Sequence, residues 1–261
     1  MDGTGIEMER DDKGIVTLWL SNPKHLNALS NKMVFDFCEI LPRLADDKTV
    51  RAILFRGRGG VFCAGRELRD IKILQTKDFD TIKHMYDHMQ KMNEVIYYCP
   101  HPTVSMIEKY ALGIASMIVN WTDIAIAEEN ALLGFPEIVH GITPYGAIPT
   151  LLNGITRKAA MDLAVTGRKI KADEAVRLGL ITRAVPAGRL QAEVDQVLAD
   201  ISKGSAAAIT KSKQFFWQCE NLTFQQGIVA STDKAITGVL QPEMREGISA
   251  FVDKKKVNWN G

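Results

Sequence analysis

Strand-like and helix-like segments alternate along the first 185 residues, and this order restricts the possible fold more than any other feature of the chain. Short runs rich in β-branched and other apolar residues occur at residues 14–23, 50–57, 102–113 and 123–135. Amphipathic stretches with apolar residues three and four positions apart, such as residues 31–44, lie between and after them. This alternation predicts an α/β fold in which crossover helices join the strands of a sheet.

The last quarter of the chain has a different pattern, because helical spacing continues there without a convincing strand. The predicted helices cover residues 189–203, 205–220, 222–238 and 242–256. We therefore expect residues 1–195 to form a core that contains the sheet. Residues 196–261 are expected to form a helical C-terminal region.

Charge and cysteine content exclude several classes of protein. The 32 basic and 31 acidic residues give a net charge of +1, so no global field favours nucleic acid or an acidic membrane. The four cysteines are scattered without C-x-x-C pairs, which argues against a zinc site or a disulfide framework and fits a reducing cytosol. The polar N-terminus and the absence of an apolar run of roughly 20 residues predict neither secretion nor membrane insertion. We expect a cytoplasmic protein.

Two glycine turns are candidates for binding a negatively charged oxygen. Gly65 ends a strand in the segment FCAGREL, and Gly113 precedes a helix in the segment YALGIAS. Turns of this kind expose backbone N–H groups, and a pair of them aimed at one atom forms an oxyanion hole. On local sequence alone, each segment is equally an ordinary tight turn between a strand and a helix.

Glu137 is the strongest candidate for an acid or base, because it directly follows Gly-Phe-Pro in the run NALLGFPEIVHGITP. The alternative interpretation is a surface glutamate in the first turn of a helix opened by Pro136, which is a common arrangement. The sequence around Glu137 does not distinguish these interpretations without the neighbouring motifs.

Taken together, these motifs resemble those of one family. FCAGREL, YALGIAS, DIAIAEENALLGFPE and HGITP follow one another in order, after NPKHLNALS and before TGRKIKADEAVRLGLITRAVP and MREGISAFVDKKK. The chain resembles the crotonase family, also called the enoyl-CoA hydratase/isomerase family, over nearly its whole length. The resemblance implies a crotonase-like spiral of ββα units with a helical C-terminal trimerisation region. It also implies an acyl-CoA substrate, a homotrimer or dimer of trimers, and no metal or redox cofactor.

The resemblance also assigns roles to individual residues. The two oxyanion-hole donors of the family map to the backbone N–H groups of Arg66 and Ile114. Contacts to coenzyme A map to Lys24, Leu26, Ala28, Cys63, Ala64 and Arg66. Glu137 occupies one of the family's two acid/base positions, where burial beside an apolar acyl chain would raise its pKa.

The family's other glutamate falls on Met117, which cannot transfer a proton. A single base can remove a proton at one carbon and return it at another, so double-bond isomerisation of an enoyl-CoA needs only Glu137 and the oxyanion hole. Hydration stays open, as do other crotonase reactions such as hydratase-lyase chemistry or thioester hydrolysis. A further alternative is a catalytically silent member that only binds acyl-CoA.

Bulky residues replace glycines around the expected acyl pocket. Tyr145 and Ile148 occupy a segment that is often glycine-rich in the family, and Tyr145 is a possible accessory acid or water-positioning group. Ordinary packing is the alternative for both residues. Met85, Met89 and Met92 recur at helical spacing, which predicts a buried helix face that could also set substrate specificity.

Overall fold

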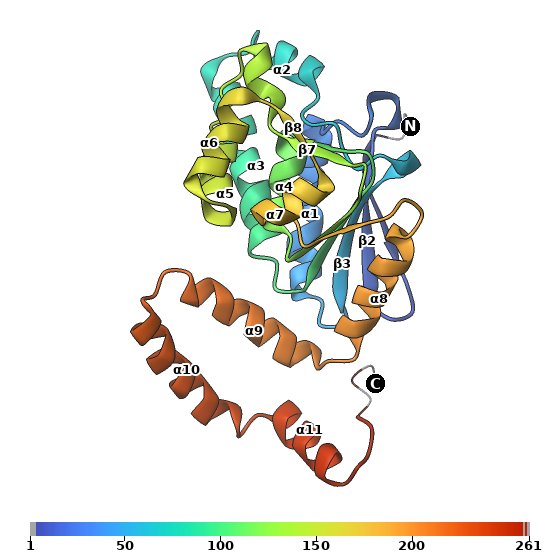
Figure 1. The fold of residues 1–261 in the computed structure, drawn as a ribbon, viewed down its shortest axis with the longest axis vertical. Helices are drawn as coiled ribbons and strands as arrows, with labels where there is room; N and C mark the ends of the chain where they lie inside the picture. Colours follow the sequence, from blue (N-terminus) through green and yellow to red (C-terminus); the bar gives the residue numbers. More distant parts are fainter. Residues whose placement is uncertain (1–3, 258, 260–261) are drawn as a thin grey trace.

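The structure, a computed structural model, describes residues 4–257 and 259, and a six-stranded sheet lies at the centre of this part (Figure 1). The strand order is β1-β2-β3-β4-β6-β9; β1 and β2 are antiparallel, and all the other pairs are parallel. The six strands are β1 (Gly5–Arg10), β2 (Ile15–Ser21), β3 (Ala52–Gly57), β4 (Thr103–Ile107), β6 (Ile124–Glu128) and β9 (Arg183–Val185).

Helices cover both faces of this sheet. The helices are α1 (Asn31–Asp46), α2 (Leu68–Leu74), α3 (Phe79–Tyr97), α4 (Ile114–Trp121), α5 (Ala147–Gly154), α6 (Arg157–Thr166), α7 (Ala172–Leu178), α8 (Leu190–Ser202), α9 (Ala206–Cys219), α10 (Phe224–Gly238) and α11 (Pro242–Val252).

Alternate residues of β3 face opposite layers, as the two-residue period of a strand requires. Phe55 packs in the larger core with residues of α1, α3 and α4, and its ring lies 5.9 Å from that of Phe37. Leu54 packs in a second core on the other face, with Leu190 and Val194 of α8. The sheet is therefore buried on both sides, which is the usual state of a mostly parallel sheet.

A second, three-stranded sheet lies beside the first in the described part of the chain. It consists of β5 (Tyr110–Leu112), β7 (Leu132–Gly134) and β8 (Lys169–Lys171), in that order. Isolated bridges pair Cys63 with Ala111 and Leu29 with Arg66. Short segments from four distant parts of the sequence are thus hydrogen-bonded side by side.

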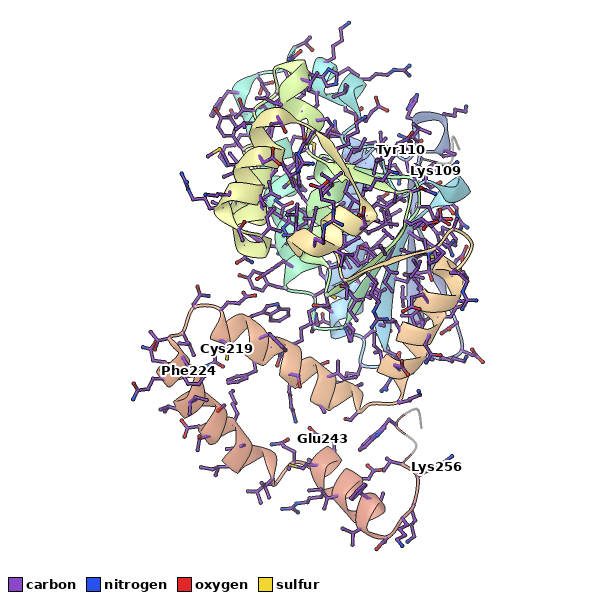
Figure 2. The ribbon with its side chains drawn as sticks, in the orientation of Figure 1. Lys109, Tyr110, Cys219, Phe224, Glu243 and Lys256 are labelled. Atoms are coloured by element: carbon purple, nitrogen blue, oxygen red, sulfur yellow. The ribbon has the colours of Figure 1, made fainter. Side chains whose placement is uncertain are left out.

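The helices α9, α10 and α11 extend away from the sheet as an arm, which is drawn in orange to red at the bottom of Figure 1. Figure 2 labels Cys219 and Phe224 where α9 turns into α10, and Glu243 at the start of α11. The root of the arm is anchored by Lys213, whose buried ammonium group donates to Asp123 at 2.6 Å and to the carbonyl of His101 at 3.0 Å.

Most segments expected from the pattern are present. Ser30 caps α1 by accepting from the N–H of Met33, and the helix continues two residues past the expected Leu44. The residue pattern did not indicate β1, β8 or α5. The boundary expected between residues 195 and 196 falls inside α8, which packs on the sheet, whereas the arm begins at α9.

No helix among the described residues is long and apolar enough to cross a membrane.

Asn27 holds the loop after β2 against the turn after β3, so its replacement should destabilise the fold. The buried amide nitrogen donates to the carbonyls of Arg58 and Val61 at 2.8 and 2.6 Å, and the amide oxygen accepts from the N–H of Asn22 at 3.0 Å. Asn27→Leu leaves three polar groups unpaired and should lower the free energy of unfolding by about 3 kcal/mol. Urea denaturation measures the change. Asn221→Leu, at an exposed position, is the control and should differ little from the wild type.

Candidate active site

A cavity of about 450 Å³ opens beside the small sheet. Its walls come from residues 64–68, from α2 and α3, from the junction of β5 and α4, and from residues 136–147. Most lining side chains are aliphatic or methionine, with a few polar groups among them, as in typical sites for small ligands. Two of the three methionines predicted to form a helix face, Met85 and Met89, line this cavity. Met92 is buried in the core.

The backbone N–H of Arg66 is left free by the way its neighbours pair. Leu29 donates its N–H to the carbonyl of Gly65 and accepts from the N–H of Glu67, so Arg66 turns its own N–H away from Leu29. On the opposite side, Cys63 exchanges two backbone hydrogen bonds with Tyr110 and Leu112 of β5. Arg66 lines the cavity at this point.

The backbone N–H of Ile114 is the second free donor, because Ile114 is the first residue of α4 and the first N–H groups of a helix have no partner within it. Gly113, just before it, donates its N–H to the carbonyl of Gly134 at 2.8 Å. Among the described residues, neither Arg66 nor Ile114 donates its N–H to another backbone group. The α4 dipole adds a partial positive charge at Ile114, which favours a negatively charged ligand atom there.

Glu137 lies directly against the backbone of Gly113. It belongs to a 3-10 turn, Pro136–His140. A β-carbon placed on Gly113 would lie only 2.6 Å from Oε1 of Glu137, and Gly113 adopts φ +57° with ψ −123°. Glycine is required here for two reasons, which are the backbone conformation and the close approach of the carboxylate.

Burial raises the pKa of the Glu137 carboxyl group above its ordinary value. Its Oε2 is buried and has no hydrogen-bond partner among the described residues. No basic side chain is a cause of this shift, so the environment favours the protonated form. A carboxyl group with a raised pKa is suited to accept and return a proton.

Met117 is buried and lines the same cavity from α4, one turn after Ile114. Its methyl carbon packs against Gly146, where a β-carbon would lie 3.0 Å away. Tyr145 also lines the cavity, but its side chain is 78% exposed at the mouth. Ser116, by contrast, holds the small sheet together, because its hydroxyl accepts from Gly134 and donates to Ala111.

The residues expected to contact coenzyme A occupy two adjacent loops. Ala64 donates its N–H to the carbonyl of Leu26 at 3.0 Å, which joins the segment of residues 24–28 to residues 63–66. Lys24 and Leu26 are exposed, Ala28 and Cys63 are buried, and Ala64 and Arg66 line the cavity.

The guanidinium group of Arg66 has partners inside the protein. It donates to the carbonyl of Leu29 and to the side chain of Asn31, and it forms an ion pair with Asp70 at 3.6 Å. Contact of this group with a ligand phosphate therefore stays a prediction.

One further cavity residue did not emerge from the sequence. Asn93 of α3 lines the cavity, and its side-chain oxygen is buried without a partner among the described residues. Its sign in the sequence was a polar residue directly after Met92 and four residues after Met89, within a row of methionines at helical spacing. The described residues contain no cluster of three His, Cys, Asp or Glu side chains that could hold a metal ion.

Comparisons with known proteins agree with one another. A family model described as Enoyl-CoA hydratase/isomerase matches residues 10–261. Over 252 residues the chain is 31% identical to the probable enoyl-CoA hydratase echA8 of Mycobacterium bovis, covering 96% of this chain and 95% of that protein. A probable mitochondrial enoyl-CoA hydratase of Dictyostelium discoideum is 29% identical, covering 95% and 87% of the two chains.

A solved enoyl-CoA hydratase structure from Mycobacterium smegmatis has the same fold. It superimposes with a TM-score of 0.91 at 27% identity and covers 98% of this chain and 99% of that one. The crotonase-like fold expected from the sequence is confirmed by this match, together with the α/β core and helical C-terminal region described above.

The unpaired carboxyl of Glu137 should lower the stability of the wild-type protein as pH rises. The pKa of Glu137 is higher in the folded state than in the unfolded state. At low pH the carboxyl is neutral in both states and does not change the free energy of unfolding. Once the pH is high enough to ionise the carboxyl in the unfolded chain, the free energy of unfolding falls. Glu137→Gln should therefore match the wild type near pH 4 and be the more stable protein near pH 8. Urea denaturation across this pH range measures the difference. The exposed Glu129→Gln is the control, and an equal gain at every pH would contradict the electrostatic cause.

Proposed function

The chain belongs to the enoyl-CoA hydratase/isomerase family, also called the crotonase family, and from this premise we propose that it transfers protons on an enoyl-CoA thioester. The observation that carries the proposal is the carboxyl of Glu137 against Gly113, whose neighbour Ile114 offers a free N–H at the start of α4. The Oε2 atom of this carboxyl is buried and has no hydrogen-bond partner among the described residues. An acid/base group and an oxyanion donor thus meet at one end of a largely apolar cavity.

The thioester carbonyl oxygen would accept hydrogen bonds from the N–H groups of Arg66 and Ile114. Negative charge builds up on this oxygen when a proton leaves the carbon next to the carbonyl. Two preorganised donors stabilise that charge, and loss of one such donor typically costs roughly 3–4 kcal/mol of transition-state stabilisation. The neighbouring loops, from Lys24 to Ala28 and from Cys63 to Arg66, would hold the coenzyme A portion.

Isomerisation is the reaction that the described groups support most directly. In a 3-enoyl thioester, Glu137 as carboxylate removes a proton from C2, and the electrons move into the thioester enolate. The same carboxyl group then delivers a proton to C4, so the double bond shifts from C3–C4 to C2–C3. This sequence needs one base, and the apolar side chain of Met117 is compatible with it.

Hydration is a second candidate because one observation favours it specifically. Asn93 adds a polar group to the cavity where a second carboxylate is absent. The catalytically silent alternative has less support, since the buried charge of Glu137 is costly to keep in a protein that only binds acyl-CoA.

We also propose that the chain assembles as a trimer or a dimer of trimers. Among the described residues, α10 and α11 bury no side chain within the single chain. Phe224, Ile236 and Leu240 are 86%, 66% and 65% exposed. A helix of this kind gains most of its stability from packing, so an apolar arm of this extent is suited to a second copy.

The Glu137→Gln substitution tests the proposed chemistry. Gln fills the same space but cannot accept a proton, so conversion of a 3-enoyl-CoA to a 2-enoyl-CoA in heavy water should fall about 10²- to 10⁴-fold. Mass spectrometry separates the outcomes, because isomerisation adds deuterium without added oxygen and hydration adds heavy water. Glu129→Gln is the matched control. Binding of acyl-CoA without turnover in both the wild type and Glu137→Gln would favour the silent alternative.

The assembly can be tested by light scattering after size exclusion. The wild type should elute at about three or six times the 29.0 kDa chain mass. The double substitution Ile236→Asp with Leu240→Asp places charges on the apolar arm and should shift the protein to the monomer mass. Lys158→Asp, on the exposed surface of α6, should not change the mass. A monomeric wild type would refute the proposed assembly.

A further inference from the structure

Two residues that line the cavity each carry a buried side-chain oxygen without a hydrogen-bond donor among the described residues. The two oxygens are Oε2 of Glu137 and Oδ1 of Asn93, and the other buried, unpaired side-chain atoms of the described residues lie outside the cavity lining. The two residues come from different walls, because Glu137 lies in the 3-10 turn after β7 and Asn93 lies on α3. An unpaired acceptor in a buried place is costly, which points to a missing donor.

Neighbouring groups do not supply that donor. Gln90, one turn earlier on α3, donates its amide to Glu94 at 2.8 Å. Met117 offers only a thioether, and the Tyr145 side chain is largely exposed at the mouth of the cavity. The side-chain oxygen of Asn93 has no hydrogen-bond partner among the described residues. The amide of Asn93 exchanges donor and acceptor by a half-turn of the terminal torsion, so it can present an acceptor to the cavity.

Both oxygens need a hydrogen-bond donor, and water and a hydroxyl group can each supply one. Each carries an O–H donor, and a water molecule has two, which match two acceptors on different walls. An unbranched hydrocarbon chain carries none. The group that completes the cavity is therefore an O–H group close to the acyl chain rather than more hydrocarbon.

We propose that Asn93 positions the water that adds to C3 of a 2-enoyl-CoA, in place of the carboxylate that is absent at Met117. This inference rests on the proposed function and extends it to hydration. Asn93 accepts a hydrogen bond from one hydrogen of the water, while Glu137 takes the other hydrogen. After addition, Asn93 accepts from the 3-hydroxyl group of the product.

The step balances without any further reactant. The water oxygen forms a bond to C3, its O–H bond to the transferred hydrogen breaks, and that proton goes to the Glu137 carboxylate. The C2–C3 double bond opens, and its electrons pass into the thioester enolate. The Glu137 carboxyl then delivers a proton to C2. Asn93 stays neutral throughout and exchanges no proton, so an amide is sufficient for its role.

The first test compares two reactions of the same protein. Hydration of trans-2-butenoyl-CoA in ¹⁸O-water needs a positioned water, whereas isomerisation of 3-butenoyl-CoA needs only Glu137 and the oxyanion hole. Asn93→Leu should lower hydration about 10- to 100-fold more than it lowers isomerisation. Asn93→Asp retains an acceptor and should hydrate faster than Asn93→Leu. The surface control Asn221→Leu should leave the ratio at its wild-type value.

Two results would overturn the role of Asn93. One is equal loss of both reactions in Asn93→Leu, which would indicate a structural role. The other is a wild-type protein that isomerises 3-butenoyl-CoA but incorporates no ¹⁸O into 2-butenoyl-CoA, because no water would then need positioning.

A binding measurement tests the role of Asn93 independently of the proposed proton transfer by Glu137. In the Glu137→Gln background, which should not turn over, calorimetry compares 3-hydroxybutanoyl-CoA with butanoyl-CoA. Asn93 should make the hydroxylated ligand bind more tightly, and Asn93→Leu should remove that preference. Equal affinity with Asn93 present would refute the inference. Failure of isomerisation in the wild type with this preference intact would instead refute only the proposed proton transfer.

Discussion

The arrangement of the site depends on backbone hydrogen bonds between short segments that are far apart in the sequence. Leu29 pairs with Arg66, Cys63 pairs with Ala111, and β5 pairs with β7. Leu29 bonds to Gly65 and Glu67, so the N–H of Arg66 between them points away from Leu29. The N–H of Ile114 is free because Ile114 begins α4. Both free N–H groups are therefore products of the backbone fold rather than of particular side chains.

Gly113 is where this framework meets Glu137, the proposed acid/base group. Its positive φ, its hydrogen bond to Gly134 and the carboxylate packed against its α-carbon occur at one residue. The close approach places Glu137 beside the Ile114 donor and also removes the carboxyl from water. The same contact therefore raises the pKa of Glu137 and destabilises its ionised form, which is the expected conflict between stability and activity.

The sequence could predict features that depend on local pattern. The cap at Ser30, the helical stop at Gly167 and the strand–helix alternation follow from residue type and spacing, and the structure contains them. Strand β1 was missed because Glu7 and Glu9 read as a polar terminus, although in the strand paired with β2 they lie on the same, exposed face. The burial of the side-chain oxygen of Asn93 depends on packing between α3 and segments distant in the sequence. The spacing of residues along one helix does not predict such packing.

Methionine at position 117 affects the electrostatics of the cavity as well as the number of carboxyl groups that can carry a proton. Two carboxylates in one small cavity would each raise the pKa of the other, and they would share protons as a coupled pair. With methionine at one position, the pKa of Glu137 is raised by burial without a second acid, and Glu137 contributes the only carboxyl group among the described residues that line the cavity. Orienting a water in this cavity then requires a group other than a second carboxylate. A neutral amide does this without adding a second buried charge, and this is the physical reason why a residue such as Asn93 suits a cavity with a single carboxylate.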